Sequence, residues 1–358
     1  MNELKYAKDA LDSLIKKGRV HLYKPIQIAE ILRKDRIEGG LNLLDKDTYR
    51  KESKKWRDIV TQKLVGNIST SSARYQDNLF EENAIPPRIL NILSQENRRT
   101  SGAVEAYIYK KLKERLKLLT SGINYCCSHN KKNFQLREFL DLFWEEPGLR
   151  RSIDKVYECI VYALIASIVI SIEAKITLSY NPEKKKIIEE FEDFTKSVLN
   201  LSLSQAIFMT SGSVHRIGAT NAADRGLDIW TNFGVIVQIK HLSLTEENAE
   251  RICNSVIADR IVIVCKSAEK YIITSLLTQI GWRNRIQSII TEKQLIIWYE
   301  KALRGKYADS LGDTLLNILI KEIHNEFPAT EECNFTQFYK ERGYHLLPED
   351  NIWLKRVD

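Results

Sequence analysis

Three side chains suited to metal-assisted hydrolysis occur in one short stretch of this sequence. Asp228 is followed by Gln238 and Lys240, which alternate with apolar residues. Because residues two apart on a strand point to the same face, Gln238 and Lys240 share one face. Residues 226–230 and 234–240 are short β-rich runs that predict a hairpin, which brings Asp228 back beside them. The pattern therefore predicts a carboxylate, an amide oxygen and an ammonium at one edge of a strand pair.

This combination suits hydrolysis of a phosphodiester. A carboxylate and a second oxygen ligand can hold a divalent cation, and a backbone carbonyl, here that of Ile239, completes the protein's share of the ligands. Such a cation polarises the phosphoryl group and acidifies a bound water. The Lys240 ammonium can orient or deprotonate that water and offset the charge gained in the transition state. In the alternative without catalysis, Asp228 caps a turn while Gln238 and Lys240 line a solvent-facing side of a strand.

The elements around the hairpin predict an α/β fold with a mixed central sheet. A buried helix is expected over residues 156–178, and an amphipathic helix over residues 182–201 with Pro182 in its first turn. After the hairpin we expect a helix over residues 245–258, an apolar strand over residues 260–265 and a helix over residues 268–280. The expected order of elements is therefore helix, hairpin, helix and strand.

The first 150 residues differ from the rest in pattern and in charge. Apolar residues at spacings of three and four predict helices, and few strand signals occur. Residues 1–150 hold 29 Lys and Arg against 20 Asp and Glu, a net charge of +9, while residues 151–358 hold 25 against 27, a net charge of −2. Such asymmetry indicates a polyanionic partner, since neutralising phosphates and releasing their counterions drives association with nucleic acid. Solvated helix faces are the alternative explanation.

A length of 358 residues allows about two domains. We expect residues 1–150 to form a mainly helical, basic DNA-binding region. Residues 151–358 are expected to form a nuclease core with a C-terminal extension.

The spacing of Asp228, nine residues and then Gln238-Ile239-Lys240 resembles the PD-(D/E)xK nuclease motif, in a variant with Gln at the middle acidic position. The chain as a whole, including Trp56-Arg57 and residues 69–78, is similar to the HaeII-type family of type II restriction endonucleases. That resemblance implies Mg²⁺-dependent cleavage of double-stranded DNA by a homodimer, at a short palindrome with a GCGC core.

Carried over to this sequence, the resemblance makes Asp228 the metal-binding carboxylate, Gln238 the second ligand and Lys240 the catalytic lysine. A neutral amide oxygen holds a hard cation less strongly than a carboxylate does. Either the metal affinity is lower or another acid helps, and Asp224 and the helix residue Glu192 are candidates for that acid.

Basic clusters supply candidates for contacts with DNA. Arginine to guanine is the commonest specific base contact, and Arg283-Asn284-Arg285 is the most concentrated set of suitable donors. Contacts to the phosphate backbone are expected from residues near Trp56 and from a second pair of arginines. These residues are Lys54, Lys55, Arg57, Arg98 and Arg99. A solvated helix face or loop is the alternative for both clusters.

Other classes of protein lack support in the sequence. No phosphate-binding glycine loop, dinucleotide, metalloprotease or serine hydrolase motif is present, so no nucleotide cofactor is expected. The longest apolar run, residues 159–172, is shorter than the roughly 18 residues of a membrane span. The N-terminus has no apolar signal core, so a cytoplasmic protein without a membrane partner is expected. A non-catalytic, sequence-specific DNA-binding protein is the main alternative function, and an α/β enzyme acting on a small molecule is a weaker one.

Overall fold

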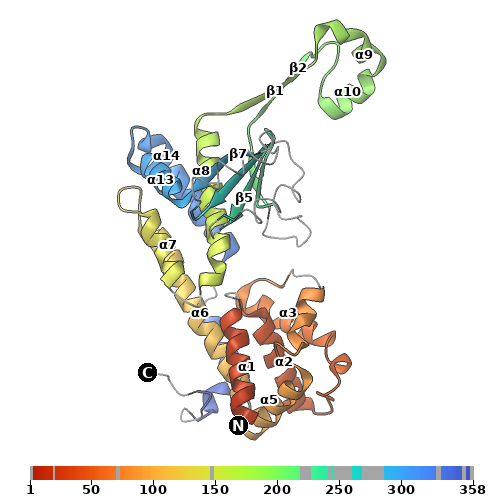
Figure 1. The fold of residues 1–358 in the computed structure, drawn as a ribbon, viewed down its shortest axis with the longest axis vertical. Coiled ribbons are helices and arrows are strands. Elements are labelled where there is room, and N and C mark those ends of the chain that lie inside the picture. Colours follow the sequence, from red (N-terminus) through yellow and green to blue (C-terminus); the bar gives the residue numbers. More distant parts are fainter. Residues whose placement is uncertain are drawn as a thin grey trace.

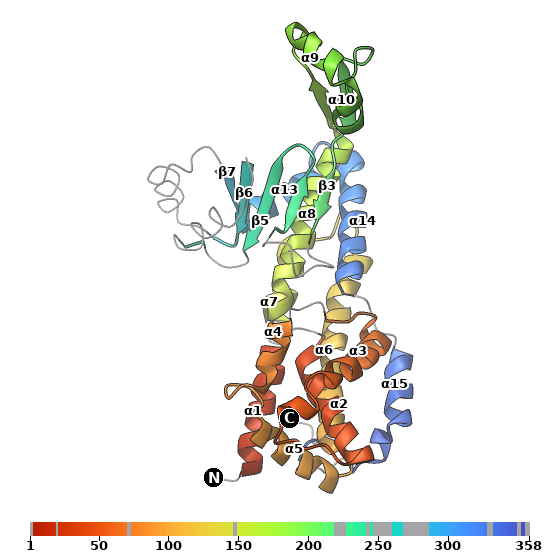
Figure 2. The same cartoon turned by 90° about the vertical axis from the view of Figure 1, so that its right-hand side faces the viewer.

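The computed structural model describes residues 3–18, 21–69, 73–145, 149–217, 227–240, 244–245, 260–267, 286–327, 332–348 and 352–354. Figures 1 and 2 show an elongated molecule with a helical region at one end, a sheet in the middle and a projecting segment at the other end. The predicted α/β fold with a helical N-terminal region and a mixed sheet is confirmed.

The N-terminal region consists of helices packed together, of which α1 and α5 each bury one apolar stripe and α2 is buried on nearly all sides. They are α1 (Glu3–Lys17), α2 (Tyr23–Glu38), α3 (Glu52–Val65), α4 (Ala73–Asp77), α5 (Pro87–Arg99) and α6 (Ala103–Ser128), with short 3-10 turns at Lys46–Thr48 and Asn78–Phe80. Helix α3 ends at Gly66, whose left-handed φ of 75° allows its N–H to bond the Gln62 carbonyl. The long helix α6 connects this region to α7 (Leu136–Glu145) and to the sheet-bearing part of the chain.

Helix α8 (Ile153–Ser171) is the central helix of this part of the protein. It packs against the sheet on one side and against α14 (Ala308–Glu326) on another. Its sequence is apolar on nearly all sides, as expected of a helix with neighbours all around it. The predicted helix over residues 156–178 is too long. The chain turns at Glu173, which has a φ of 48°, and Leu178 lies in a strand.

Beyond α8 the chain forms a projecting segment, residues 172–212, which we call the arm. It contains β1 (Lys175–Ser179), a 3-10 turn (Pro182–Lys184), α9 (Lys185–Glu190), α10 (Glu192–Leu199) and β2 (Ile207–Ser211). Strands β1 and β2 pair antiparallel. The single helix predicted over residues 182–201 is wrong, because it breaks at Phe191 and a new helix starts with acidic residues in its first turn.

The main sheet has the order β3-β4-β5-β6-β7. Its strands are β3 (Val214–Arg216), β4 (Ile229–Thr231), β5 (Val235–Lys240), β6 (Arg260–Cys265) and β7 (Ile286–Thr291). Strands β3, β4 and β5 pair antiparallel, whereas β5, β6 and β7 pair parallel. The predicted hairpin is confirmed as β4 and β5, which are joined by a turn in which Gly234 has a φ of 82°. The predicted strand over residues 260–265 is confirmed as β6. The helices predicted over residues 245–258 and 268–280 lie outside the described residues, apart from Thr245.

The C-terminal part returns to the N-terminal region. Helices α13 (Glu292–Arg304) and α14 lie beside the sheet, and α15 (Glu332–Glu341) and the turn Tyr344–Leu346 follow. Arg342 pairs with Glu30, and the Tyr344 hydroxyl donates to Glu105 at 2.7 Å. Contacts therefore cross the predicted division at residue 150, because the end of the chain packs on the first helices. No helix among the described residues is long and apolar enough to cross a membrane.

Candidate active site

The Asp228 carboxylate lies at the start of β4, facing the end of β5. Its Oδ2 accepts hydrogen bonds from Gln238 Nε2 at 2.5 Å and from the backbone N–H of Ile239 at 2.6 Å. The antiparallel pairing of β4 with β5 produces this contact, because Ile229 lies opposite Val237. Both hydrogen bonds use one oxygen, and no hydrogen bond from the described residues reaches Oδ1.

Gln238 and Lys240 both lie on β5, two residues apart, as the hairpin pattern predicts. Gln238 is 3% exposed, and Lys240 is partly buried. Burial raises the pKa of Asp228, while the hydrogen bond from Ile239 and the charges of Lys240 and Lys155 oppose that rise. The structure thus brings Asp228 and Gln238 into contact and places the Lys240 ammonium close enough to act on the carboxyl group.

Glu158 is a second buried acid near Asp228, and sequence reasoning missed it. It lies on α8 and its side chain is 6% exposed. Burial raises its pKa to about 6, and the neighbouring charge of Asp228 contributes to that rise. Lys155 opposes it and donates to both carboxyl oxygens at 2.8 Å. The sequence does mark Glu158 as a candidate, because it is an acid within a largely apolar helix. Such a residue is rarely buried without a partner or a function.

A buried arginine holds the elements around this pair of acids. Arg216 on β3 is 4% exposed and bonds Glu322 at 2.9 Å and Glu326 at 2.7 Å, both on α14. Its guanidinium also lies 3.7 Å from Glu158. The next residue, Ile217, donates its backbone N–H to the carbonyl of Asp228 at 2.9 Å. Strand β3 therefore connects both acids to α14, which fixes their relative positions.

These residues fit a hard divalent cation. Glu158 is buried and Asp228 is partly buried, burial raises the pKa of both carboxyl groups, and a cation between such groups would reverse that rise. The donors are oxygens, and Mg²⁺ commonly takes only one or two carboxylates from a protein while keeping several waters. No group of three His, Cys, Asp or Glu residues suitable for a metal occurs within the described ranges.

The sequence suggested two further acids, Asp224 and Glu192. Asp224 lies outside the described residues. Glu192 lies at the start of α10 in the arm, where its Oε1 accepts from the backbone N–H of Leu203 at 3.2 Å. Figures 1 and 2 both show α10 well away from β5. The structure does not bring Glu192 to Asp228, and Glu158 lies there instead.

The expected phosphate contacts around Trp56 fall into two groups. Arg57 is 1% exposed and donates to Asp58, Gln27 and Gln76, so its side chain is part of the N-terminal core. A phosphate contact from Arg57 therefore conflicts with its burial. Lys54 pairs with Asp77 at 2.7 Å and is partly exposed, while Lys55 is 71% exposed.

The arginine pair at the end of α5 is engaged by acids. Arg98 bonds both oxygens of the buried Asp35, and Arg99 bonds Glu96 at 2.8 and 2.9 Å. In both views α5 lies at the end of the N-terminal region that is farther from the sheet. The structure does not bring Arg98 or Arg99 near Asp228. The predicted base-reading residues Arg283, Asn284 and Arg285 lie outside the described residues.

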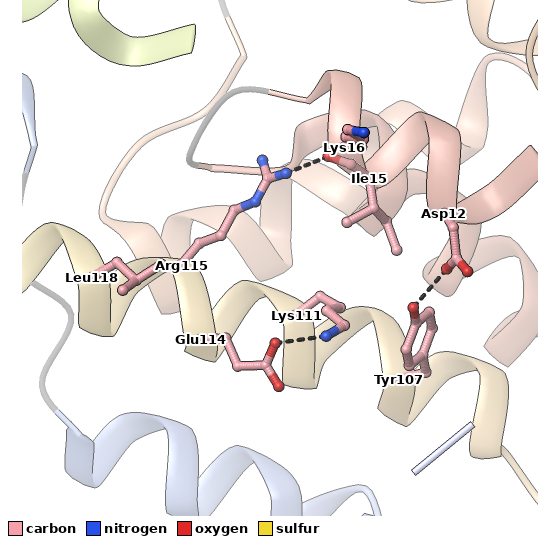
Figure 3. Close-up of a pocket in the computed structure, with 8 residues that line it drawn as sticks. All are labelled: Asp12, Ile15, Lys16, Tyr107, Lys111, Glu114, Arg115 and Leu118. Atoms are coloured by element: carbon pink, nitrogen blue, oxygen red, sulfur yellow. Dashed lines mark hydrogen bonds and ion pairs between the residues drawn. The ribbon is translucent and has the colours of Figure 1, made fainter. Parts of the chain in front are cut away.

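A surface pocket of about 270 Å³ between α1 and α6 is shown in Figure 3. Its polar groups bond one another: Tyr107 donates to Asp12 at 2.5 Å, and Lys111 to Glu114 at 2.8 Å. Arg115 donates to backbone carbonyls at the end of α1. The contacts of Tyr107 and Arg115 join the two helices, so the pocket is a packing feature.

The buried acids beside an ammonium are of the kind expected in a metal-assisted phosphodiester hydrolase. The sequence profile of the HaeII restriction endonuclease family matches residues 7–344. Over 345 residues, 96% of this chain, the sequence is 54% identical to "Type II restriction enzyme HaeII" of Haemophilus aegyptius and 51% identical to "Type II restriction enzyme NgoBI" of Neisseria gonorrhoeae. The alignments cover 98% of each relative, and no solved structure matches. The chain belongs to the HaeII restriction endonuclease family, which confirms the resemblance found in the sequence.

Proposed function

We propose that this protein is a type II restriction endonuclease that hydrolyses double-stranded DNA at a short palindrome and requires Mg²⁺. Family membership over almost the whole chain supports the class of enzyme. The observation that supports the chemistry is the contact of Asp228 with Gln238 and Ile239, beside Lys240 and Glu158. The GCGC core of the site is proposed from the family resemblance alone.

Asp228 and Glu158 are proposed to hold Mg²⁺, with the amide oxygen of Gln238 and the backbone carbonyl of Ile239 as further ligands. When bound, Mg²⁺ polarises the scissile phosphoryl group and lowers the pKa of a water ligand. Two hydrogen bonds hold Oδ2 of Asp228 in place, so the orientation of this carboxylate is set before DNA binds. Glu158 supplies the second negative charge that Gln238 lacks.

Lys240 is proposed to position the attacking water and to carry positive charge beside the phosphate. Its strand is central in the sheet and pairs with β6 up to Lys240, which lies opposite Cys265, so the backbone under this side chain is held on that side. Lys155 has a different role, because it bonds both oxygens of Glu158 and keeps that acid ionised. The two lysines thus stabilise opposite sides of the acid pair.

The DNA partner is proposed to contact the basic N-terminal part, where residues 1–150 carry a net charge of +9. The exposed Lys55 and the partly exposed Lys54 remain proposed phosphate contacts, and Arg283, Asn284 and Arg285 remain proposed base contacts. A palindromic site is matched by a two-fold protein, so we propose a homodimer that acts in the cytoplasm.

Incubation of the purified protein with a sequenced plasmid, in Mg²⁺ or in EDTA, tests the proposal. We expect discrete linear fragments in Mg²⁺ only, with ends that map to one palindrome. DNA that is retarded in a gel but never cut under either condition would contradict it and would favour the non-catalytic DNA-binding protein.

A further inference from the structure

The arm is unusually apolar on its surface. Ten of the 24 large hydrophobic side chains that are exposed in the described residues lie in the arm, which is only residues 172–212. They are Ile172, Leu178, Ile187, Phe191, Phe194, Val198, Leu199, Leu203, Ile207 and Met209. Single exposed apolar residues are ordinary, but a concentration of this kind marks a surface that contacts another molecule.

The arm also lacks a core of its own. Its buried hydrophobic side chains are Ile188 and Leu201, and neither belongs to the main core cluster of the protein. Its sheet is a ribbon of two strands, which is marginally stable in water without further packing. In Figures 1 and 2 the arm extends beyond the sheet and beyond α14. The arm therefore needs a surface outside this chain to cover it.

Four of the exposed side chains form a stripe. Ile187, Phe191, Phe194 and Val198 are separated by four, three and four residues, and each is more than half exposed. Ile187 lies on α9, Phe191 lies between the two helices, and Phe194 and Val198 lie on α10, so the stripe spans both short helices. Ile188 and Thr195 lie between them in the sequence and are buried against the arm itself. The helical part of the arm thus has a few buried positions beside an exposed apolar set.

The charges on the arm identify the partner. Residues 172–212 hold five basic and six acidic residues, a net charge of −1, so the arm is poorly suited to DNA. The charges are also segregated, since Lys184, Lys185 and Lys186 precede an acidic group at residues 189–193. No ion pair links the two groups within the described part of the chain. In a two-fold contact each surface meets its own copy, so the basic group of one arm would face the acidic group of the other.

We infer that the apolar stripe of the arm docks against the same stripe of a second copy of this chain. The two α9–α10 segments run antiparallel in this arrangement, with apolar side chains between them and opposite charges at both ends. The surface continues onto Ile168 and Ile170 at the end of α8, the helix that also carries Glu158. If the proposed function holds, the dimer supplies one Asp228 site for each DNA strand.

The test is the mass of the full-length protein in sedimentation equilibrium, without DNA or metal. Wild type is expected at twice 41.5 kDa, and the variant Phe191→Glu/Phe194→Glu at 41.5 kDa. The matched control Leu346→Glu/Ile352→Glu changes two equally exposed residues outside the arm and should remain dimeric. A monomeric wild type, or a stripe variant that is still dimeric, would overturn the inference. Neither result concerns the Asp228 chemistry, which is measured separately.

A charge exchange identifies the partner independently of the apolar residues. The triple variant Lys184→Glu/Lys185→Glu/Lys186→Glu and the triple variant Glu189→Lys/Glu190→Lys/Asp193→Lys should each be monomeric, because like charges would meet. Mixing the two should restore a particle of twice the monomer mass. If the mixture stays monomeric while each variant keeps the thermal stability of wild type, the proposed antiparallel contact is wrong. Loss of DNA retardation with an unchanged dimer mass would instead assign the arm to DNA.

Discussion

The backbone N–H of Ile239 donates a 2.6 Å hydrogen bond to the carboxylate of Asp228, across the β4–β5 hairpin. Ile239 is the residue between Gln238 and Lys240, so its side chain points into the core while its N–H points to the acid. One strand therefore supplies a side-chain amide and a backbone donor to this carboxyl group, and the charge of Lys240 on the same strand lowers its pKa. The position of Asp228 is set by the backbone as well as by side chains.

Replacing Lys240 with Ala should lower the cleavage rate by about 1,000-fold, because it removes the ammonium proposed to position the attacking water. The fold should persist, since Lys240 is only partly buried and lies at the end of its strand. Single-turnover cleavage of plasmid DNA with saturating enzyme measures the rate. The control Lys301→Ala, on the exposed side of α13, should cut at the wild-type rate. A Lys240→Ala protein as fast as this control would exclude a catalytic role.

Replacing Glu158 with Gln should weaken Mg²⁺ binding, so that half-maximal cleavage requires about 100-fold more Mg²⁺. The reason is that the variant keeps the shape of the side chain but loses one of the two proposed anionic ligands. A titration of the cleavage rate against Mg²⁺ concentration measures this shift. Glu300→Gln, a change of the same kind on the exposed face of α13, should leave the titration unchanged. An unshifted Glu158→Gln titration would remove Glu158 from the site.

Glu158 should also make the free energy of unfolding depend on pH when EDTA keeps the protein free of metal. Its pKa rises from 4.5 to about 6 on folding, so the folded protein binds this proton more tightly than the unfolded chain does. The resulting stability is present below pH 4.5 and is lost as the pH rises through about 6. The loss corresponds to about 2 kcal/mol. Urea unfolding of wild type and of Glu158→Gln at several pH values should show wild type losing that amount relative to the variant. A difference that stays constant with pH would contradict the assignment.

Replacing Arg57 with Ala should destabilise the protein by about 3 kcal/mol, because Gln27, Gln76 and Asp58 would lose their buried donor. Lys55→Ala, two residues away and exposed, should change stability by less than about 0.5 kcal/mol. Its effect should appear as weaker DNA binding with a smaller salt dependence. Denaturant unfolding and DNA titrations at two salt concentrations separate the two roles. Equal stabilities of the two variants would show that Arg57 is not structural.

The sequence predicted those features that depend on local pattern. The hairpin follows from alternation around the turn at Gly234, and the contact between Asp228 and Gln238 follows from that hairpin. Helices α1 and α5 follow from their apolar spacing, because each buries one stripe. These relationships involve residues close together in the chain, so a pattern of a few residues is enough to find them.

Other features depend on contacts between distant residues. Glu158 precedes Asp228 by 70 residues, and only the packing of α8 on the sheet brings them together. Arg57 has basic neighbours in sequence, but it falls on the buried stripe of α3 with Val60, Thr61 and Leu64. The arm was predicted as helix because its apolar residues resemble a core pattern, whereas they face outward. The pattern alone does not tell a core face from a docking face.

The central claim is that Asp228 is required for metal-dependent cleavage, and an isosteric substitution tests it most directly. Asp228→Asn keeps the size of the side chain but removes the charge that would hold Mg²⁺. We predict that this variant binds the same DNA fragment as wild type and produces no fragments in Mg²⁺, while Asp309→Asn, a fully exposed acid on α14, cuts normally. Cleavage by Asp228→Asn at the wild-type rate would contradict the account.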